Sequence, residues 1–106
     1  MTYRQARVLF TRSVAKLIEY ADSQGDEMAM AYVKRCKDCP VGIDGAHQQC
    51  LAVDMDLYRN GKYLTSTKAH EKYGEFWKGL HPDMRWGGDF KRKDGNHFSL
   101  RFWGKS

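Results

Sequence analysis

Hydrophobic positions recur every three or four residues across residues 3–24, a spacing that predicts one amphipathic helix. The residues that share its apolar side are Phe10, Val14, Leu17, Ile18 and Ala21. Thr2 is of a type favoured as an N-cap, and Gly25 is of a type that commonly ends a helix. We interpret the apolar side as a face packed against a core.

Apolar and polar residues then alternate in two segments, which predicts strands. The first segment covers residues 27–35, and the second, residues 51–58, places its Leu, Val and Met residues on one side. Residues 36–46 lie between them and contain Pro and two Gly, so we expect a loop there. Asn60-Gly61 is a strong signal for a two-residue turn, and residues 62–65 are therefore predicted to return as a hairpin strand.

A second helix and a final strand complete the pattern. The helix is predicted over about 68–79, with an apolar side made of Tyr73, Phe76, Trp77 and Leu80. Residues 85–96 are expected to form a loop and a turn. In the strand that follows, His97 and Phe98 face opposite ways because strand side chains alternate.

The predicted fold class is α+β: a small antiparallel sheet with an N-terminal helix and a second helix, in a single domain. A chain of 106 residues suits one compact core. No apolar run approaches the roughly 20 residues that span a membrane, and the first residues lack the apolar segment of a signal peptide. We therefore expect synthesis in the cytoplasm and no membrane insertion.

The net charge of +5 and the pI near 9.2 favour a polyanionic partner. Nucleic acid, acidic lipid and bacterial cell wall all fit that description. The three cysteines are Cys36, Cys39 and Cys50, an odd number that argues against a disulfide framework in a chain without an export signal.

Two histidines and two strand-end aspartates suggest a metal site. His47 lies in a Gly-flanked loop before the second strand, Asp54 lies within that strand, and His97 begins the last one. Imidazole nitrogen and carboxylate oxygen suit Zn²⁺, and three protein ligands leave a fourth position for water, as in catalytic zinc sites. We expect His47, Asp54 and His97 to bind Zn²⁺.

The remaining titratable residues receive other roles. Asp94 is interpreted as the general base, and we expect it to stay out of the coordination shell because a turn separates it from His97. Asp56 is interpreted as a solvated residue at a strand end. His70 and His81 are interpreted as surface residues of the second helix.

Two segments together resemble a known family. His47-x-x-Cys-x-Ala-Val-Asp54 resembles the Ser-x-His-x-x-Gly-x-Ala-x-Asp signature of the M15 family of zinc peptidases, the D-alanyl-D-alanine carboxypeptidases and phage L-alanyl-D-glutamate endolysins. Trp86-Gly-Gly-Asp-Phe, followed by Asp94-Gly-Asn-His97-Phe, resembles the family's C-terminal segment, in which Trp-Gly-Gly precedes Asp-x-x-His-Phe. The resemblance covers about residues 27–102.

The resemblance implies zinc on the same three ligands, Asp94 as catalytic acid and base, and a substrate-binding role for Arg35. It also implies a peptidoglycan stem peptide as substrate, cut at L-alanyl-D-glutamate rather than D-alanyl-D-alanine. A monomeric phage lysis enzyme of this kind accumulates in the host cytoplasm and reaches the wall through a holin pore. Gly45 and Cys50 depart from the family's serine and glycine, and the missing serine bears on substrate contacts more than on metal binding.

Two alternatives use the same residues. Cys36-x2-Cys39-x7-His47-x2-Cys50 is the pattern of a closed Cys3His structural zinc knuckle, which would make a nucleic-acid-binding module. That spacing is uncommon among knuckles and leaves the Trp86–His97 segment without a role. The other alternative is an inactive, wall-binding relative of the peptidase.

Overall fold

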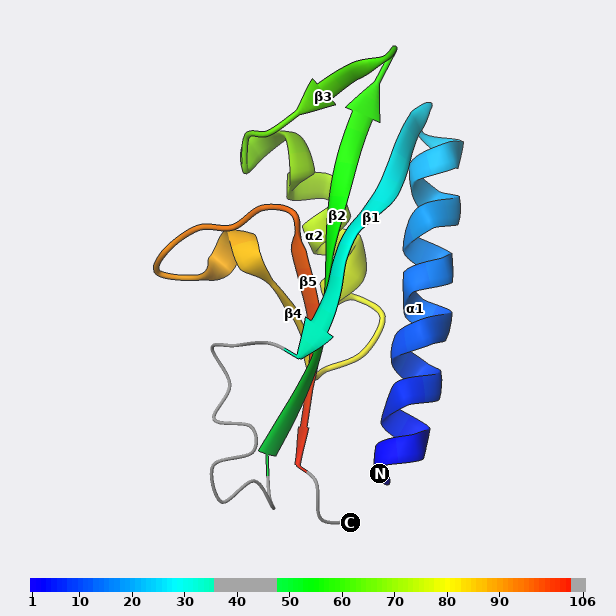
Figure 1. The fold of residues 1–106 in the computed structure, drawn as a ribbon, viewed down its shortest axis with the longest axis vertical. Helices are drawn as coiled ribbons and strands as arrows, with labels where there is room; N and C mark the ends of the chain where they lie inside the picture. The colour runs from blue at the N-terminus through cyan, green and yellow to red at the C-terminus, as the bar shows by residue number, and fades with distance from the viewer. Residues whose placement is uncertain (36–47, 104–106) are drawn as a thin grey trace.

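The structure is a computed structural model that describes residues 1–35 and 48–103, and the side chains of 1–31 and 51–102. Within these residues it confirms the α+β class, with two α-helices and a five-stranded antiparallel sheet (Figure 1). The helices are α1 (Tyr3–Ser23) and α2 (Glu71–Lys78), the latter preceded by a 3-10 turn, η1 (Lys68–His70). The strands are β1 (Asp26–Arg35), β2 (Gln48–Arg59), β3 (Lys62–Leu64), β4 (Met84–Trp86) and β5 (His97–Trp103).

Helix α1 begins and ends where its sequence predicts. The Thr2 hydroxyl accepts a hydrogen bond from the Gln5 N–H at 3.1 Å, and the Thr2 N–H donates to the Gln5 side chain at 2.7 Å. This reciprocal pair gives hydrogen-bond acceptors to two backbone N–H groups at the start of the helix. Gly25 follows the helix with a φ of 81°, a conformation that glycine adopts without steric cost. Figure 1 shows α1 running alongside β1.

Strand β2 organises the sheet because it has two successive partners on one edge. The strand order is β1-β2-β5-β4; Gln48–Asp54 pair with β5, and Leu57–Arg59 pair with β3. The predicted Asn60-Gly61 turn that joins β2 to β3 is confirmed, with φ values of 52° and 77°. Positive φ at both turn residues is the geometry of a type I′ hairpin. Between its two partners, β2 leaves a gap at residues 55–56.

Strand β4 was not predicted, because residues 85–96 were expected to form a loop and a turn. Met84–Trp86 instead pair with Phe98–Leu100 of β5. A three-residue strand is too short to show period-two alternation. Pro82 and Gly87, which are residue types common in loops, lie on either side of it. Its pairing is decided by the neighbouring strand and by burial of Met84 and Trp86.

The core lies between the two helices and one face of the sheet. It contains the predicted apolar faces of α1, β2, α2 and β5, namely Phe10, Leu17, Ala21, Val53, Met55, Leu57, Tyr73, Trp77, Phe98, Leu100 and Phe102. Trp77 is fully buried and meets the rings of Phe10 and Phe98 edge-on, with centroids 5.8 and 5.7 Å away. Its indole N–H donates to the Ser99 carbonyl at 2.9 Å, which satisfies its polar group inside the core. Neither described helix is both long and apolar enough to cross a membrane.

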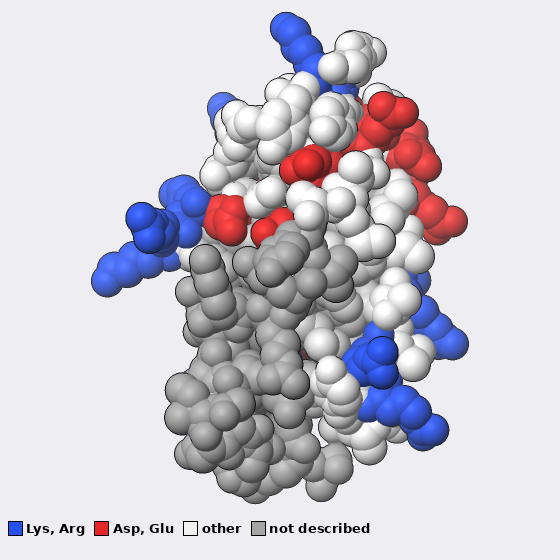
Figure 2. Space-filling model, viewed as in Figure 1, with Lys and Arg blue, Asp and Glu red and all other residues white. Residues whose placement is uncertain are grey.

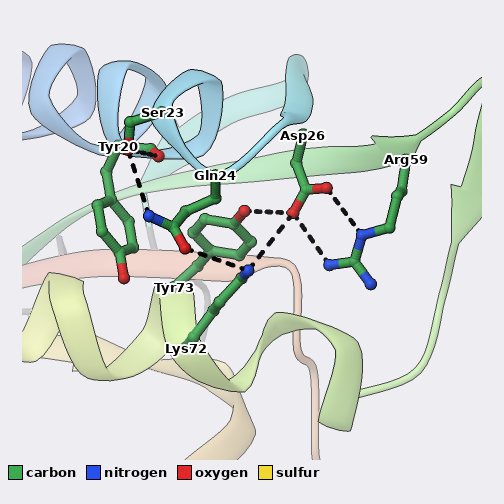
Figure 3. A network of polar contacts seen from close by, with 7 residues as sticks. All are labelled: Tyr20, Ser23, Gln24, Asp26, Arg59, Lys72 and Tyr73. Atoms are coloured by element: carbon green, nitrogen blue, oxygen red, sulfur yellow. Dashed lines mark hydrogen bonds and ion pairs between the residues drawn. The ribbon is translucent and has the colours of Figure 1, made fainter.

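A buried carboxylate at the start of β1 joins this strand to β2 and α2 (Figure 3). Asp26 is 2% exposed and accepts hydrogen bonds from the Arg59 guanidinium at 2.8 and 3.0 Å. The Tyr73 hydroxyl also donates to it, and the Lys72 ammonium lies 4.0 Å away. The hydrogen bond from Arg59 is the main reason that the pKa of Asp26 falls from 3.8 to about 2. Burial opposes this shift, and the tyrosine and lysine support it.

Replacement of Asp26 by Asn is expected to lower the free energy of unfolding by about 2 kcal/mol at pH 7. Because the folded pKa lies below the unfolded one, the contribution is complete above about pH 4 and is lost as the pH falls toward 2. Urea unfolding from pH 2 to pH 7 measures both effects. Glu27→Gln, at the exposed neighbouring position, is the control. Equal pH dependence in Asp26→Asn and the wild type would contradict the assignment.

Candidate metal centre

Asp54 and His97 face each other across the β2–β5 pair. They are direct partners in the strand register, and the adjacent pair, Val53 and Phe98, points into the core. Alternation along both strands therefore places Asp54 and His97 on the sheet face opposite the helices. His97 is 4% exposed, and its Nδ1 lies 3.3 Å from Oδ1 of Asp54.

Asp94 joins this pair, and the three side chains form a cluster of possible metal ligands. One ligand atom from each of Asp54, Asp94 and His97 lies within 4.8 Å of the other two. The turn that precedes β5 folds back on itself, since the His97 N–H donates to the Asp94 carbonyl at 3.1 Å. The turn therefore brings Asp94 close to His97, and whether Asp94 binds a metal or acts as a base stays a prediction. Asp94 is exposed, whereas His97 is buried.

The cluster offers one imidazole nitrogen and two carboxylate oxygens, donor types that zinc can accept. Ligand atoms about 2.0–2.2 Å from a tetrahedral Zn²⁺ lie about 3.3–3.6 Å from one another. The separation of His97 Nδ1 from Asp54 Oδ1 is 3.3 Å, which falls in this range and is also a hydrogen-bonding distance. One imidazole and one or two carboxylates are ligands that zinc accepts, with further positions left for another residue or water.

The turn that carries Asp94 is fixed by Trp86 and Gly87. The Asp94 N–H donates to the Gly87 carbonyl at 2.9 Å, and the Trp86 indole N–H donates to the Gly95 carbonyl at 2.8 Å. A Cβ on Gly87 would lie 2.0 Å from the Asp94 carbonyl oxygen and 2.8 Å from Cβ of His97. Only glycine permits so close an approach, which gives the Trp-Gly-Gly element a physical role: it holds Asp94 and His97 in place.

Several predicted site residues lie outside the described part of the chain. These are His47, Gly45, Cys36 and Cys39. For Arg35 and Cys50 the structure describes only the backbone, in β1 and β2 respectively. The roles predicted for these six residues stay predictions, and so does the Cys3His alternative. Among the described residues, the structure brings together Asp54, His97 and Asp94.

The interpretation of His70 as a surface residue is wrong. His70 is 1% exposed, and its Nδ1 lies 2.8 Å from the Ser66 carbonyl oxygen. Its Nε2 is buried without a hydrogen-bond partner among the described residues. The sequence contained a signal for this burial, because His70 is spaced three and seven residues from the core residues Tyr73 and Trp77.

A polar cavity adjoins the candidate metal centre. It has a volume of about 180 Å³ and lies where the pairing partner of β2 changes from β5 to β3. Asp94 lines it and is therefore shared with the ligand cluster; Asp56, Thr67, His70 and Lys93 also line it. Figure 2 shows acidic side chains close together on this face, with Lys and Arg toward its margins, although the whole chain is basic.

Comparisons of the chain with family models, with curated proteins and with solved structures find no match.

Gly87→Ala is expected to lower the free energy of unfolding by about 1–3 kcal/mol, because the new methyl group displaces the Asp94 turn. Gly79→Ala is the matched control: its Cβ would meet the nearest atom at 3.4 Å, so a change below about 1 kcal/mol is expected. Thermal and urea unfolding of both variants test this. Equal stability of the two variants would show that the turn tolerates a side chain at position 87.

Proposed function

We propose that this protein is a zinc-dependent peptidoglycan peptidase that hydrolyses an amide bond of the stem peptide. The observation that supports it best is the meeting of Asp54, Asp94 and His97. These residues come from two segments 40 or more positions apart, and both segments resemble parts of the same zinc peptidase signature. The resemblance and the geometry are independent arguments for one site.

In this proposal, His97 and Asp54 hold the metal together with His47. The chemistry that a bound Zn²⁺ supplies is Lewis acidity, which polarises a carbonyl and favours deprotonation of water near neutral pH. Burial of His97 keeps its ring in one orientation, and the strand pairing keeps Asp54 opposite it. The protein thereby offers preformed ligands, which lowers the cost of ordering them on binding.

Asp94 is proposed as the general base and acid. Its carboxylate is exposed, adjoins the cavity and lies within 4.8 Å of the ligand atoms of Asp54 and His97. From this position it takes a proton from the attacking water and passes it to the leaving amine. The hydrogen bonds from the Asp94 N–H to Gly87 and from Trp86 to Gly95 fix the main chain on which it sits.

The proposed substrate is the bacterial stem peptide, with the L-alanyl-D-glutamate bond preferred. This choice rests on the resemblance of the Trp86-Gly-Gly segment to the endolysin branch. The proposed setting is a phage lysis enzyme that accumulates in the host cytoplasm and acts on the wall after release. The net charge of +5 favours association with the anionic wall.

Zinc content tests the metal site directly. We expect purified wild-type protein to contain zinc by elemental analysis, and Asp54→Ala and His97→Ala to lose it, because each removes a ligand. Asp83→Ala, at an exposed aspartate outside the cluster, should retain the metal. A Cys36→Ser/Cys39→Ser double variant should retain it as well. Loss of zinc only in the cysteine variant would instead support a structural knuckle and a nucleic-acid partner.

Asp94→Asn tests the catalytic role. Because the amide cannot accept the proton, kcat for hydrolysis of purified peptidoglycan is expected to fall about 10²–10⁴-fold while zinc is retained. Release of new amino termini, identified by mass spectrometry, measures the rate and identifies the bond that is cut. Near-normal turnover in Asp94→Asn would contradict the assignment of Asp94 as the general base. Absence of wild-type hydrolysis would remove the proposed function.

A further inference from the structure

The cavity beside the candidate metal centre has properties of a binding site for a charged group. It exists because β2 changes partners: β5 ends its pairing at Asp54, and β3 begins its own at Leu57. The intervening residue Asp56 projects from the same strand face as Asp54, two positions away. A group bound next to Asp56 would therefore lie beside the proposed reacting centre.

The charged groups of the lining favour a cation. Asp56 and Asp94 contribute two carboxylates, whereas Lys93 contributes one ammonium, which already donates to the Gly88 carbonyl at 3.2 Å. The Asp56 carboxylate is half-buried and accepts a hydrogen bond from the Tyr63 hydroxyl at 3.2 Å. The charge of Asp56 also raises the pKa of Tyr63, so this hydroxyl stays protonated as a donor.

His70 supplies a second, independent observation. Its Nδ1 contacts a carbonyl oxygen, which can only accept, so Nδ1 carries the hydrogen in this contact. Nε2 is buried, and no described residue donates to it. A buried polar atom without a partner is costly in a folded protein and is commonly associated with function. This residue lines the same cavity as Asp56.

From these observations we infer that the cavity binds the ammonium-terminated side chain of a diamino acid in the substrate, with Asp56 as its counter-ion. An ammonium group offers three N–H donors to a wall that is rich in acceptors. The volume of about 180 Å³ exceeds the roughly 150 Å³ of a protein cavity that holds benzene, so a flexible side chain of similar size fits.

This inference rests on the proposed function, since it assigns a subsite for the residue that follows glutamate in the stem peptide. Two sources supply the ammonium: a lysine side chain, or a diaminopimelate side chain with a carboxylate at the same end. Lys93 distinguishes them, because this residue lines the cavity and its positive charge would pair with the extra carboxylate.

The test measures binding of product dipeptides, which lack the scissile bond, to the zinc-loaded protein by NMR titration. γ-D-Glutamyl-L-lysine is expected to bind about tenfold more tightly than its Nε-acetyl derivative, because acetylation removes the charge. Asp56→Asn should abolish this preference, and Asp83→Asn, at an exposed site away from the cavity, should keep it. γ-D-Glutamyl-diaminopimelate is compared in the same way: if it binds more tightly than γ-D-glutamyl-L-lysine, Lys93→Gln should make the two affinities equal and leave the affinity for the lysine dipeptide unchanged.

Equal binding of the free and acetylated dipeptides to the wild type, or no binding of either, would overturn the inference without reliance on any variant. A preference that survives in Asp56→Asn would also overturn it. If the protein hydrolyses peptidoglycan but binds the free and acetylated dipeptides equally, the subsite is refuted and the proposed function stays intact. A preference without hydrolysis would leave the subsite and refute the peptidase.

Discussion

The pairing of β2 with β5 is the interaction on which the rest of the structure depends. In this register Val53 meets Phe98 inside the core, and Asp54 meets His97 on the opposite face. Because side chains alternate along a strand, a one-residue slip of either strand would turn the candidate ligand of that strand toward the core and separate it from its partner. The hydrophobic effect that buries Phe98 and its neighbours therefore also holds the two candidate ligands together. Stability and the candidate site are coupled through one set of backbone hydrogen bonds.

Close backbone packing supports this strand pair from one side. Gly87 lies so near Asp94 that no side chain fits, and the indole of Trp86 donates to the turn between Asp94 and His97. The same indole is buried in the core, so the turn is anchored to the hydrophobic core. At the far end of the sheet, the buried Asp26 carboxylate ties β1 to Arg59 of β2 and to Tyr73 of α2. Together these contacts leave little freedom in the strands that carry the site.

The change of partner along β2 gives the site its second part. Between the end of the β5 pairing and the start of the β3 pairing, β2 keeps one hydrogen bond, from the Met55 N–H to the Asn96 carbonyl, and the polar cavity lies beside this interval. Its acidic lining contrasts with the basic chain as a whole, which suggests separate roles for the two charges. The overall charge suits attraction to an anionic wall, whereas the local charge suits a cationic group of the substrate. In this proposal, the overall positive charge favours binding to the wall, and the acidic cavity lining favours binding of the substrate ammonium.

Elements with strong local signals can be predicted from the amino-acid sequence alone. The cap at Thr2, the Asn60-Gly61 turn, the apolar face of α1 and the alternation of β5 follow from residue types and spacing over a few positions, and the structure confirms them. Asp54, His97 and Asp94 were identified from their motifs as site residues, and the structure brings them together. The three-residue strand β4, the approach of Asp94 to Asp54 and the cavity at Asp56 become visible only in the folded protein. Each of these depends on contacts between residues distant in sequence, and such contacts leave no periodic pattern in the chain.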